Sequence, residues 1–342
     1  MRRTFFLLAI LALLLGAVYY IYFLKNPKLS EGEVVITIPQ GTSVAALTDT
    51  LAAHDLLRSS LAFQIAARTL GAAKDLHAGR YRIAPGLSNI EIIRRLTGSE
   101  YALILRATFP EGITIYRAAS IAKDKLGLDS GIFMRFAFDT AFLHALGVPA
   151  EAHSAEGYLF PDTYEFLLSA DPKGLLTKMI KHWKRMADDS LYENSDEEDL
   201  SLQEVMTLAS IVEAEAHRPD ERDTIAGVYL NRLRIGMKLD ADPAVQYGLH
   251  LTPGMSDHPR PITHDDLLTP NPYNSYMNVG LPPGPICNPG AASIRAVLHP
   301  AKSKYLYFVA RRDGSGGHYF SKSLAEQDRK INMARANALS EP

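Results

Sequence analysis

The sequence is poor in the residues that usually reveal a covalent framework or a bound metal. Cys287 is the only cysteine among 342 residues, so no disulfide can form within the chain and stability must come from packing. Its Pro- and Gly-rich surroundings contain no obvious base, which argues against a nucleophilic thiol. The His-Glu-x-x-His motif is absent, and His250, His258 and His264 do not have zinc-site spacing. We therefore predict no metal site and no cofactor.

The chain also lacks a large excess of either positive or negative charge. Lysine and arginine together number 36 against 38 acidic residues, and no basic stripe or arginine cluster is evident. This balance argues against a nucleic-acid partner. Hydrophobic residues at 47% and charged residues at 22% describe an ordinary folded chain, and the length predicts about two domains.

Long hydrophobic runs are missing except for one at the N-terminus. Residues 4–24 are uncharged and almost wholly apolar, and roughly 21 residues are enough to cross a bilayer as a helix. Aromatic residues crowd the far end of the run, as in an interfacial belt. A cleaved signal peptide is the alternative, but the run is too long and lacks small residues at a cleavage position. We predict a cytoplasmic N-terminus at residues 1–3, a single-pass anchor at 4–24, and the rest of the chain on the outer side.

Three short segments share one pattern of strand, glycine and hydroxyl residue. They are residues 34–43, 81–88 and 107–114, and in each the Ser or Thr is placed to begin a helix. The spacings differ, so these are related small units and not a solenoid. The pattern looks like LysM-type modules, which bind chitin-like glycans. We expect a LysM-like region over residues 30–104, with a plain packing or spacer domain as an equal alternative.

A carboxylate stands on the apolar stripe of a predicted helix over residues 202–216. Ser201 and Glu204 form a capping box, and the segment has no Gly or Pro. With Leu202 at zero and about 100° per residue, Glu213 falls at about 20°, within the apolar stripe, whereas Glu215 falls near 220°, on the far side. Apolar residues also lie off the stripe, so the helix could be buried more widely than on one face.

A carboxylate in this position suggests acid chemistry. Burying the ionised form is costly, so such a group normally stays protonated, and a neutral acid is what protonation of a glycosidic oxygen requires. The structural alternative is a buried Glu213 bonded to backbone or to an arginine such as Arg232.

Further motifs follow one another in a fixed order along the chain. They are Glu-Gly-Tyr-Leu-Phe-Pro-Asp-Thr-Tyr at 156–164, Ala-Ser-Ile-Val-Glu at 209–213, Val-Tyr-Leu-Asn-Arg-Leu at 228–233, Leu-Asp-Ala-Asp-Pro-Ala-Val-Gln-Tyr at 239–247, Pro-Tyr-Asn-Ser-Tyr at 272–276 and the Pro/Gly-rich run at 280–290. Together they resemble the membrane-bound endolytic murein transglycosylases, the YceG-like or MltG family, over close to the whole chain. Ser275 stands where Thr is more usual, a change that keeps the hydroxyl.

This resemblance implies a peptidoglycan lyase of the cell inner membrane with a periplasmic catalytic domain. Such an enzyme cleaves the β-1,4 bond between N-acetylmuramic acid and N-acetylglucosamine in nascent strands, leaves 1,6-anhydro ends and terminates elongation. In the family the Glu of the Ser-Ile-Val-Glu run is catalytic, first as acid and then as base, and it maps onto Glu213. Motif position suggests groove residues at Tyr158, Asn231, Gln246, Asn274, Tyr276 and Asn288.

The expected fold class is α+β, with the N-terminal transmembrane helix, the LysM-like region and a catalytic domain over residues 105–342. The catalytic domain turns largely helical from about residue 115 and carries the catalytic Glu on a buried helix. Residues 255–288 are rich in Pro, Asn, Gly and Tyr, and a loop of that length is usually functional. A β-hairpin over residues 305–321 and a final helix over 324–339 close the chain.

Two rival functions remain open. Hydrolysis of a glycoside usually needs a second carboxylate, and the motifs offer Glu156, Asp162, Asp240 and Asp242, so a muramidase that uses water is possible chemistry. A non-catalytic glycan-binding scaffold for cell-wall synthases would also satisfy the anchor and the LysM-like region. The expected partners are glycan strands, the inner membrane and peptidoglycan synthases. Product mass separates the two enzymes, and any turnover rejects the scaffold.

Overall fold

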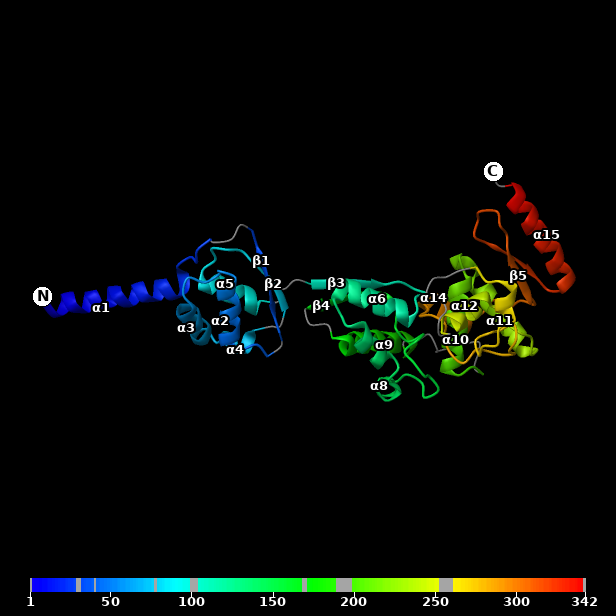
Figure 1. The fold of residues 1–342 in the computed structure, drawn as a ribbon, viewed down its shortest axis with the longest axis horizontal. Helices are drawn as coiled ribbons and strands as arrows, with labels where there is room; N and C mark the ends of the chain where they lie inside the picture. Colours follow the sequence, from blue (N-terminus) through cyan, green and yellow to red (C-terminus); the bar gives the residue numbers. More distant parts are fainter. Residues whose placement is uncertain are drawn as a thin grey trace. The chain divides into compact units, whose positions relative to one another are not determined.

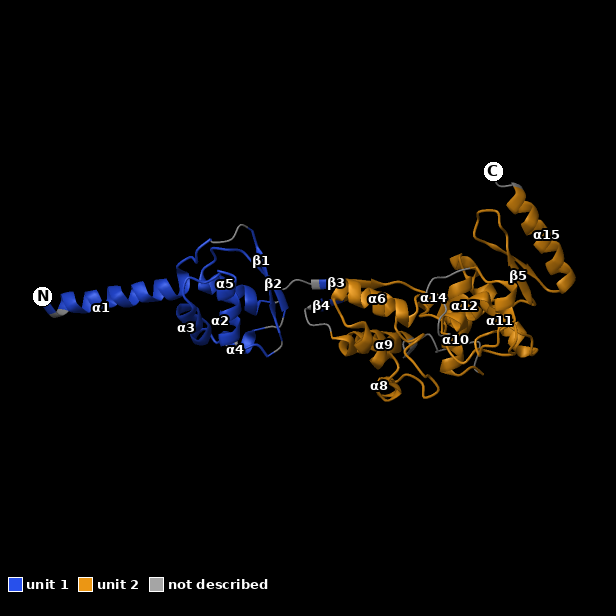
Figure 2. Cartoon of the chain, in the orientation of Figure 1, with its two compact units in different colours: residues 1–106, 165–170 blue, residues 107–164, 171–342 orange. Residues whose placement is uncertain are grey.

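The protein divides into two compact units. We analysed a computed structural model that describes residues 2–28, 32–39, 41–76, 79–98, 104–167, 171–188, 199–251 and 261–340. Unit 1 comprises Met1–Arg106 and Glu165–Ala170, and unit 2 comprises Ala107–Tyr164 and Asp171–Pro342 (Figure 2). His258, one of the three histidines considered above, lies outside the described residues.

An apolar helix begins the chain. It consists of α1 (Arg2–Val18) and a π-helical end, η1 (Tyr19–Phe23) (Figure 1). Residues Thr4–Phe23 have a mean hydropathy of 2.4, and the helix is long and apolar enough to cross a membrane. None of residues 4–23 is fully buried, and an exposed apolar helix suits either a single-pass anchor or a signal sequence.

The end of this helix forms part of unit 1. Ile21 and Tyr22 pack against the unit's hydrophobic core, and the Asn89 side-chain amide donates to the Ile21 carbonyl at 2.7 Å. Just beyond, Lys25 pairs with Glu91 at 2.6 Å. The N-terminal helix therefore runs into the core of unit 1 and is not joined to it by a loose linker.

Unit 1 is a two-stranded antiparallel sheet covered by helices. Strand β1 pairs with β2 in a register that places Val34 opposite Ile83. Alternate residues of both strands point inward, so Ile36 and Tyr81 are buried against Leu51 and Phe63 of the helices. The elements are β1 (Val34–Ile38), α2 (Val44–Ala53), α3 (Ser60–Thr69), α4 (Ala72–Asp75), β2 (Gly79–Ile83) and α5 (Asn89–Thr97).

The three predicted strand–glycine–hydroxyl segments are confirmed. The glycines at 41, 86 and 112 have φ of 78°, 83° and 75°, a left-handed conformation that glycine adopts at low cost. The hydroxyl residues at 43, 88 and 114 are the N-caps of α2, α5 and α6 (Ile115–Leu126). The first two segments belong to unit 1. The third belongs to unit 2, where its glycine, Gly112, lies next to Glu213 of helix α10 (Leu202–Glu215).

Unit 2 is mainly helical, with one small sheet and part of a second one, whose two strands are divided by the unit boundaries. Strand β3 (Ile104–Phe109) pairs with β4 (Asp162–Leu167), and β5 (Tyr307–Ala310) pairs with β6 (His318–Ser321) as the predicted hairpin. The remaining helices are α7 (Ser130–Ala137), α8 (Thr140–Ala145), α9 (Pro172–Asp188), α10 (Leu202–Glu215), η3 (Pro219–Glu221), α11 (Arg222–Arg234), α12 (Asp242–His250), α13 (His264–Leu267), α14 (Ala291–Leu298) and α15 (Leu324–Ser340). The protein is thus a mixed α+β structure with an apolar N-terminal helix.

Helix α10 lies at the centre of unit 2 (Figure 1). Every residue from Val205 to Val212 is buried, because α11, α12 and α14 all pack against this helix. The expectation of burial on more than one face is therefore confirmed. The predicted capping box also forms, with the Ser201 N–H donating to the Glu204 carboxylate at 2.8 Å.

Candidate active site

Helix α10 presents two carboxylates near its C-terminal end, and they point in different directions. Glu213 and Glu215 are two positions apart, which on a helix separates their side chains by about 200°. Glu213 faces α14, and Glu215 faces α11 and the start of α12. The far side of the helix is therefore buried as well, and the two carboxylates lie in different surroundings.

Glu213 has one cationic and two hydrogen-bonding partners. Its side chain is 7% exposed and lies 3.4 Å from the guanidinium of Arg222. The Ser293 hydroxyl donates to its second oxygen at 2.7 Å, and the Gly290 N–H donates to the same oxygen at 3.1 Å. Gly290 is the N-cap of α14. The arginine partner is thus Arg222, and not Arg232 as the structural alternative supposed.

Glu111, which lies in the third strand–glycine–hydroxyl segment, is close to the Glu213 carboxylate. A Cβ placed on Gly112 would lie 3.6 Å from Glu213 Cγ, and one on Gly290 would lie 1.9 Å from a Glu111 oxygen. Burial raises the pKa of Glu111, and the charge of Glu213 raises it further, while Arg222 lowers it. These glycines let the two carboxylates share the space beside Arg222.

Glu215 has the surroundings of a neutral acid. The Tyr229 hydroxyl donates to it at 3.0 Å. Burial raises the pKa of Glu215 to about 7; the Tyr229 hydrogen bond lowers it, the charge of Asp242 raises it, and Arg232 lowers it. The helical position of Glu215 in the sequence predicted that it faces away from the apolar stripe. Its burial follows from the packing of α11 and α12 against this side of α10.

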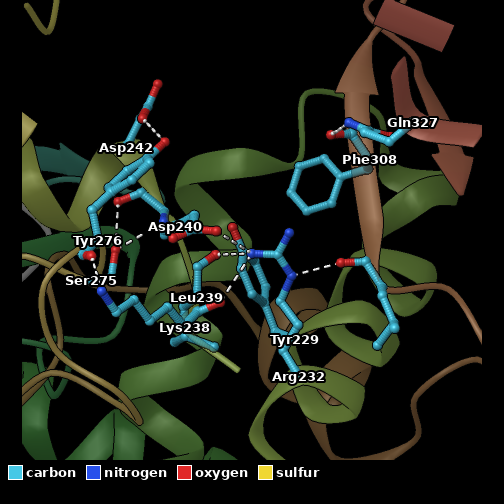
Figure 3. Close-up of polar contacts among 12 residues, drawn as sticks. Tyr229, Arg232, Lys238, Leu239, Asp240, Asp242, Ser275, Tyr276, Phe308 and Gln327 are labelled. Carbon is cyan, nitrogen blue, oxygen red and sulfur yellow. Dashed lines mark hydrogen bonds and ion pairs between the residues drawn. The ribbon is translucent and has the colours of Figure 1, made fainter. Parts of the chain in front are cut away.

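Further polar residues gather around Glu215. The Tyr276 hydroxyl donates to Asp242 at 2.7 Å, and this pair lies beside Asp240 (Figure 3). Burial raises the pKa of Asp240, and Arg232 lowers it. We call this set the acid cluster; its members are Glu215, Tyr229, Arg232, Asp240, Asp242 and Tyr276.

Arg232 connects the acid cluster to the backbone of neighbouring segments. Its Nε donates to the Leu306 carbonyl at 2.6 Å, while Nη1 donates to the carbonyls of Leu239 at 2.7 Å and Lys238 at 3.1 Å. The same Nη1 lies 3.2 Å from Asp240 (Figure 3). One buried guanidinium therefore joins α11 to the turn before α12 and to the segment that leads into β5.

The Ser275 hydroxyl fixes the loop that carries Tyr276. It accepts from the Ala241 N–H at 2.8 Å and donates to the Ala241 carbonyl at 3.1 Å. A threonine would supply the same hydroxyl, so the departure from the usual family residue leaves this link intact.

A second buried carboxyl joins two of the sequence motifs. Glu156 accepts from the Ile115 N–H at 3.0 Å and from the Asn288 side chain at 3.0 Å. Burial raises its pKa to about 8, against the lowering effect of its hydrogen bonds. The Asn288 oxygen in turn accepts from the N–H groups of Gly157 and Leu159. This network ties the 156–164 motif to the Pro/Gly-rich run.

Several of the predicted groove residues lie inside the fold. Tyr158 is fully buried and packs edge-to-face on Trp183 at 4.8 Å. Asn274 is also buried and donates to the carbonyls of Leu267 and Thr269. Together with Asn288, these side chains connect loops, so their location does not suit direct contact with a glycan.

The other predicted residues lie at three separate places. Tyr276 belongs to the acid cluster, whereas Gln246 is exposed on α12. Asn231 donates to two carbonyls of the segment before β5 and lines a cavity on the other side of α11. Asp162 on β4, a candidate second carboxylate, lies 3.3 Å from His182 on α9. Glu215 is not among the predicted site residues, whereas Asp242 lies in one of the motifs named above.

Among the described residues, no group of three His, Cys, Asp or Glu side chains is placed to hold a metal ion. Within this part of the chain, His250 packs its ring on Tyr116 at 4.9 Å. The prediction that the protein needs no metal stays a prediction.

The chain is similar to known proteins over most of its length. Residues 36–333 match the YceG-like family. An endolytic murein transglycosylase of Bacillus subtilis (strain 168) is 32% identical, and the match covers 92% of this chain and 89% of that protein. One from Streptococcus pneumoniae (strain D39) is 28% identical over 88% of this chain and 58% of its own length. The crystal structure of a YceG-like protein from Listeria monocytogenes matches with a TM-score of 0.58 and 29% identity, covering 88% of this chain and 99% of that one.

Proposed function

The chain belongs to the YceG-like family, and from this premise we propose that it is an endolytic murein transglycosylase that uses Glu215 as its general acid. It cleaves the β-1,4 bond between N-acetylmuramic acid and N-acetylglucosamine in nascent peptidoglycan and leaves 1,6-anhydro ends, which terminates strand elongation. The relatives named above support the activity. The observation that carries the assignment of the acid is the environment of the Glu215 carboxyl, which accepts from the Tyr229 hydroxyl at 3.0 Å and whose pKa burial raises to about 7.

The two carboxylates of α10 differ in their contacts. Glu213 lies beside Arg222 and accepts from Gly290 and Ser293. Around Glu215, burial disfavours the ionised form, and the main compensation is one neutral phenol. The role of Glu213 as the acid, which the family motif suggests, is the competing prediction and is tested below.

The environment of Glu215 suits both proton transfers of a transglycosylase. The neutral carboxyl gives its proton to the glycosidic oxygen, and the C–O bond to the leaving sugar breaks. The resulting carboxylate, held by Tyr229 and balanced by Arg232, then takes the proton of the muramic acid 6-hydroxyl as that oxygen bonds to C1. A pKa near the working pH serves both steps, because neither the acid nor the base form is scarce.

Asp242 supports a second candidate reaction. Its charge acts on Glu215, so two carboxyl groups lie close together, which is the arrangement a muramidase needs to activate water. Mass spectrometry of the products decides between the reactions, because an anhydro end is lighter by one water than a reducing end. Anhydro ends from purified protein support the transglycosylase, and reducing ends show a hydrolase that uses the same acid.

The raised pKa of Glu215 predicts a characteristic pH dependence. We expect kcat/KM to fall as the pH rises through about 7, because the acid form is lost. Folding should show the matching trend. The folded-state pKa lies above the ordinary value of 4.5, so the folded chain holds a proton that the unfolded chain releases, and stability falls as the pH rises from 4.5 to about 7.

Matched unfolding curves of wild type and Glu215→Gln test this prediction. The pH-dependent loss at Glu215 should reach about 3 kcal/mol at most and should be absent in the variant, which carries no titrating group at this position. Glu156, whose pKa is also raised, adds the same trend to both proteins and therefore cancels in the comparison. Equal pH slopes in the two proteins would contradict the burial of an acid at position 215.

The N-terminal helix serves as an uncleaved single-pass anchor with a cytoplasmic N-terminus in this proposal. Signal-peptide cleavage after the apolar run would remove Ile21 and Tyr22 from the core of unit 1. A chain that begins at Tyr19 keeps these contacts, whereas one that begins at Pro27 also loses the Lys25–Glu91 ion pair.

The two shortened chains test whether the anchor contributes to catalysis. We expect both to cut soluble glycan strands, because the acid cluster lies wholly in unit 2. The chain that begins at Pro27 should show a lower melting temperature for unit 1, since buried apolar side chains are missing. A shortened chain with a cooperative melt but no cleavage would show that the anchor contributes to catalysis.

Unit 1 acts as a LysM-like glycan-binding region in this proposal. Its two paired strands, with α2, α3 and the short α4 between them, support that assignment. Binding of long glycan strands that is lost when unit 1 is removed would support it, and undiminished binding would favour a spacer. Peptidoglycan synthases are the expected protein partners.

A further inference from the structure

Helix α3 of unit 1 leaves a group of apolar side chains exposed. Among the described residues of unit 1 beyond the N-terminal helix, four large hydrophobic side chains are exposed, and three of them lie on α3 or at its C-cap. These three are Leu61, Ile65 and Leu70, and the fourth is Val35 on β1. Exposed apolar side chains that stand singly are ordinary, but a group of them marks an interaction surface.

Two of these side chains share one side of α3 with an arginine. At about 100° per residue, Ile65 falls at about 40° from Leu61, and Arg68 falls at about −20°. The buried residues of the helix lie around the opposite side; they are Ala62, Phe63, Ala66 and Ala67. We call Leu61, Ile65 and Arg68 the outer face of α3. The outer face of a helix in a soluble domain is normally polar, so an apolar one indicates a partner of low polarity.

Hydrogen bonds hold both ends of α3 to the place where the chain leaves the N-terminal helix. At its C-terminal end, the hydroxyl groups of Thr69 and Tyr22 share a hydrogen bond of 2.7 Å. Just before its start, the Arg58 guanidinium donates to the Lys25 carbonyl at 3.1 Å. Helix α3 also packs against η1, and Figure 1 shows it at the edge of unit 1 beside the end of the N-terminal helix.

The length of the apolar helix places α3 at the depth of the membrane surface. The stretch that can cross a bilayer is Thr4–Phe23, with 20 residues. At about 1.5 Å per residue it is about 30 Å long, which is the thickness of the hydrocarbon layer, so no helical length is left to lift unit 1 away from the lipid. Its last part is η1, against which α3 packs. A helix that spans the bilayer therefore brings α3 level with the lipid head groups.

We propose that α3 is a membrane-contact helix whose outer face lies on the phospholipid surface at the outer side of the bilayer. The inference rests on the anchor of the proposed function, because the anchor sets the depth of α3. Leu61 and Ile65 enter the boundary between head groups and acyl chains, where interfacial helices bury their apolar side chains. Arg68 binds lipid phosphate while the aliphatic part of its side chain stays in the apolar layer.

Fluorescence quenching with the full chain in vesicles tests this contact. Ile65→Trp and Val35→Trp each add one indole to unit 1, at positions with matched exposed fractions of 38% and 40%. The native Trp183 is buried in unit 2 and gives the same background in both. The vesicles contain phosphatidylethanolamine and phosphatidylglycerol, with or without brominated acyl chains. We expect bromination to lower the added emission of Ile65→Trp by at least roughly twofold and to leave that of Val35→Trp nearly unchanged.

Two further pairs of changes test whether the outer face itself makes the contact, since an indole alone favours an interface. Leu61→Gln with Arg68→Gln, added to Ile65→Trp, removes the other members of the outer face and should reduce the quenching by roughly half or more. Val35→Thr with Arg80→Gln is the matched control on the sheet and should leave the quenching unchanged. All four positions are exposed, so the melting temperature should stay close to that of wild type.

Flotation of the vesicles distinguishes failure of this inference from failure of the anchor. Protein that floats with the vesicles but shows equal quenching at the two indole positions would keep the anchor and overturn the contact of α3 with lipid. Equal quenching together with a dimer that forms as protein concentration rises would also overturn it and would assign the outer face to a second copy of the chain. Protein that does not float, or whose mass shows that the N-terminal helix has been removed, would overturn the anchor and this inference with it. Glycan cleavage by the same preparations reports on the proposed activity separately.

Discussion

Glu215→Gln is expected to abolish glycan cleavage while leaving the fold intact. Glutamine has nearly the same shape and can still accept the Tyr229 hydrogen bond, but it can neither give nor take the proton. Each proton transfer contributes about 10²–10⁴-fold to the rate, so the loss of both should lower kcat by at least roughly 10³-fold. Release of muropeptides from purified strands, measured by chromatography and mass spectrometry, gives the rate. Thermal unfolding shows that the variant is folded.

The matched variant is Glu213→Gln, which changes a carboxylate on the same helix. Here the amide would lose the ion pair with Arg222 and would place its NH₂ group near the donors from Gly290 and Ser293. We expect a loss of about 1–3 kcal/mol in unfolding free energy. Folded Glu213→Gln protein should keep its rate within about tenfold of wild type, because the proton stays at Glu215.

The pair of variants also tests the assignment that the family motif suggests. If Glu213→Gln is folded and inactive while Glu215→Gln cleaves at nearly the wild-type rate, then Glu213 is the acid and Glu215 is a structural carboxyl. If both folded variants lose three orders of magnitude, neither carboxylate acts alone.

Arg232→Met should cause the largest loss of stability at this site. The change removes hydrogen bonds to three carbonyls, of which that of Leu239 is buried, and leaves Asp240 without its arginine (Figure 3). The Asp240 side chain is 36% exposed, so solvent screens the lost ion pair and the unsatisfied carbonyls account for most of the loss, about 1–3 kcal/mol for each one that is fully buried. Because Arg232 also lowers the pKa of Glu215, the alkaline limb of the pH–rate profile should move to higher pH in any folded protein that remains.

Arg232→Lys is the control for charge without shape. One ammonium group cannot reach Leu306 on one side and Leu239 on the other, so most of the stability should still be lost. Unfolding by denaturant measures both variants. A lysine variant as stable as wild type would show that charge alone matters here, and that the bridging geometry does not.

Local features of this chain could be predicted because their causes are close in sequence. The capping box of Ser201 and Glu204 depends on residues three apart, and the turn at Gly86 followed by the cap at Ser88 depends on neighbours. The final hairpin is equally local. Each of these interactions joins residues that are close in sequence, so it forms independently of the packing of distant segments.

The environment of Glu215 could not be predicted in this way. A helical phase measured from one apolar stripe assumes that the opposite side is solvated, and α10 is instead covered on several sides. Tyr229 comes from the following helix and Asp242 from the helix after that. The burial that sets the pKa thus depends on contacts between distant segments.

The predicted groove residues show a related limit. An asparagine in a Pro- and Gly-rich motif suits sugar recognition, but it suits loop anchoring equally well. Asn288 bonds four different backbone or side-chain groups inside the fold, and Asn274 bonds the loop after α13. Which role applies depends on whether the amide faces solvent, and residue type alone does not determine that.

The N-terminal helix and unit 1 must turn together. Because Ile21 and Tyr22 belong to the core of unit 1 and Asn89 bonds the helix backbone, no swivel separates the two parts. In a bilayer, the tilt of the helix would then set the height of unit 1 above the lipid surface and the direction in which its faces point. A sideways force on unit 1 would then act as a torque on the helix, which a flexible tether would not transmit.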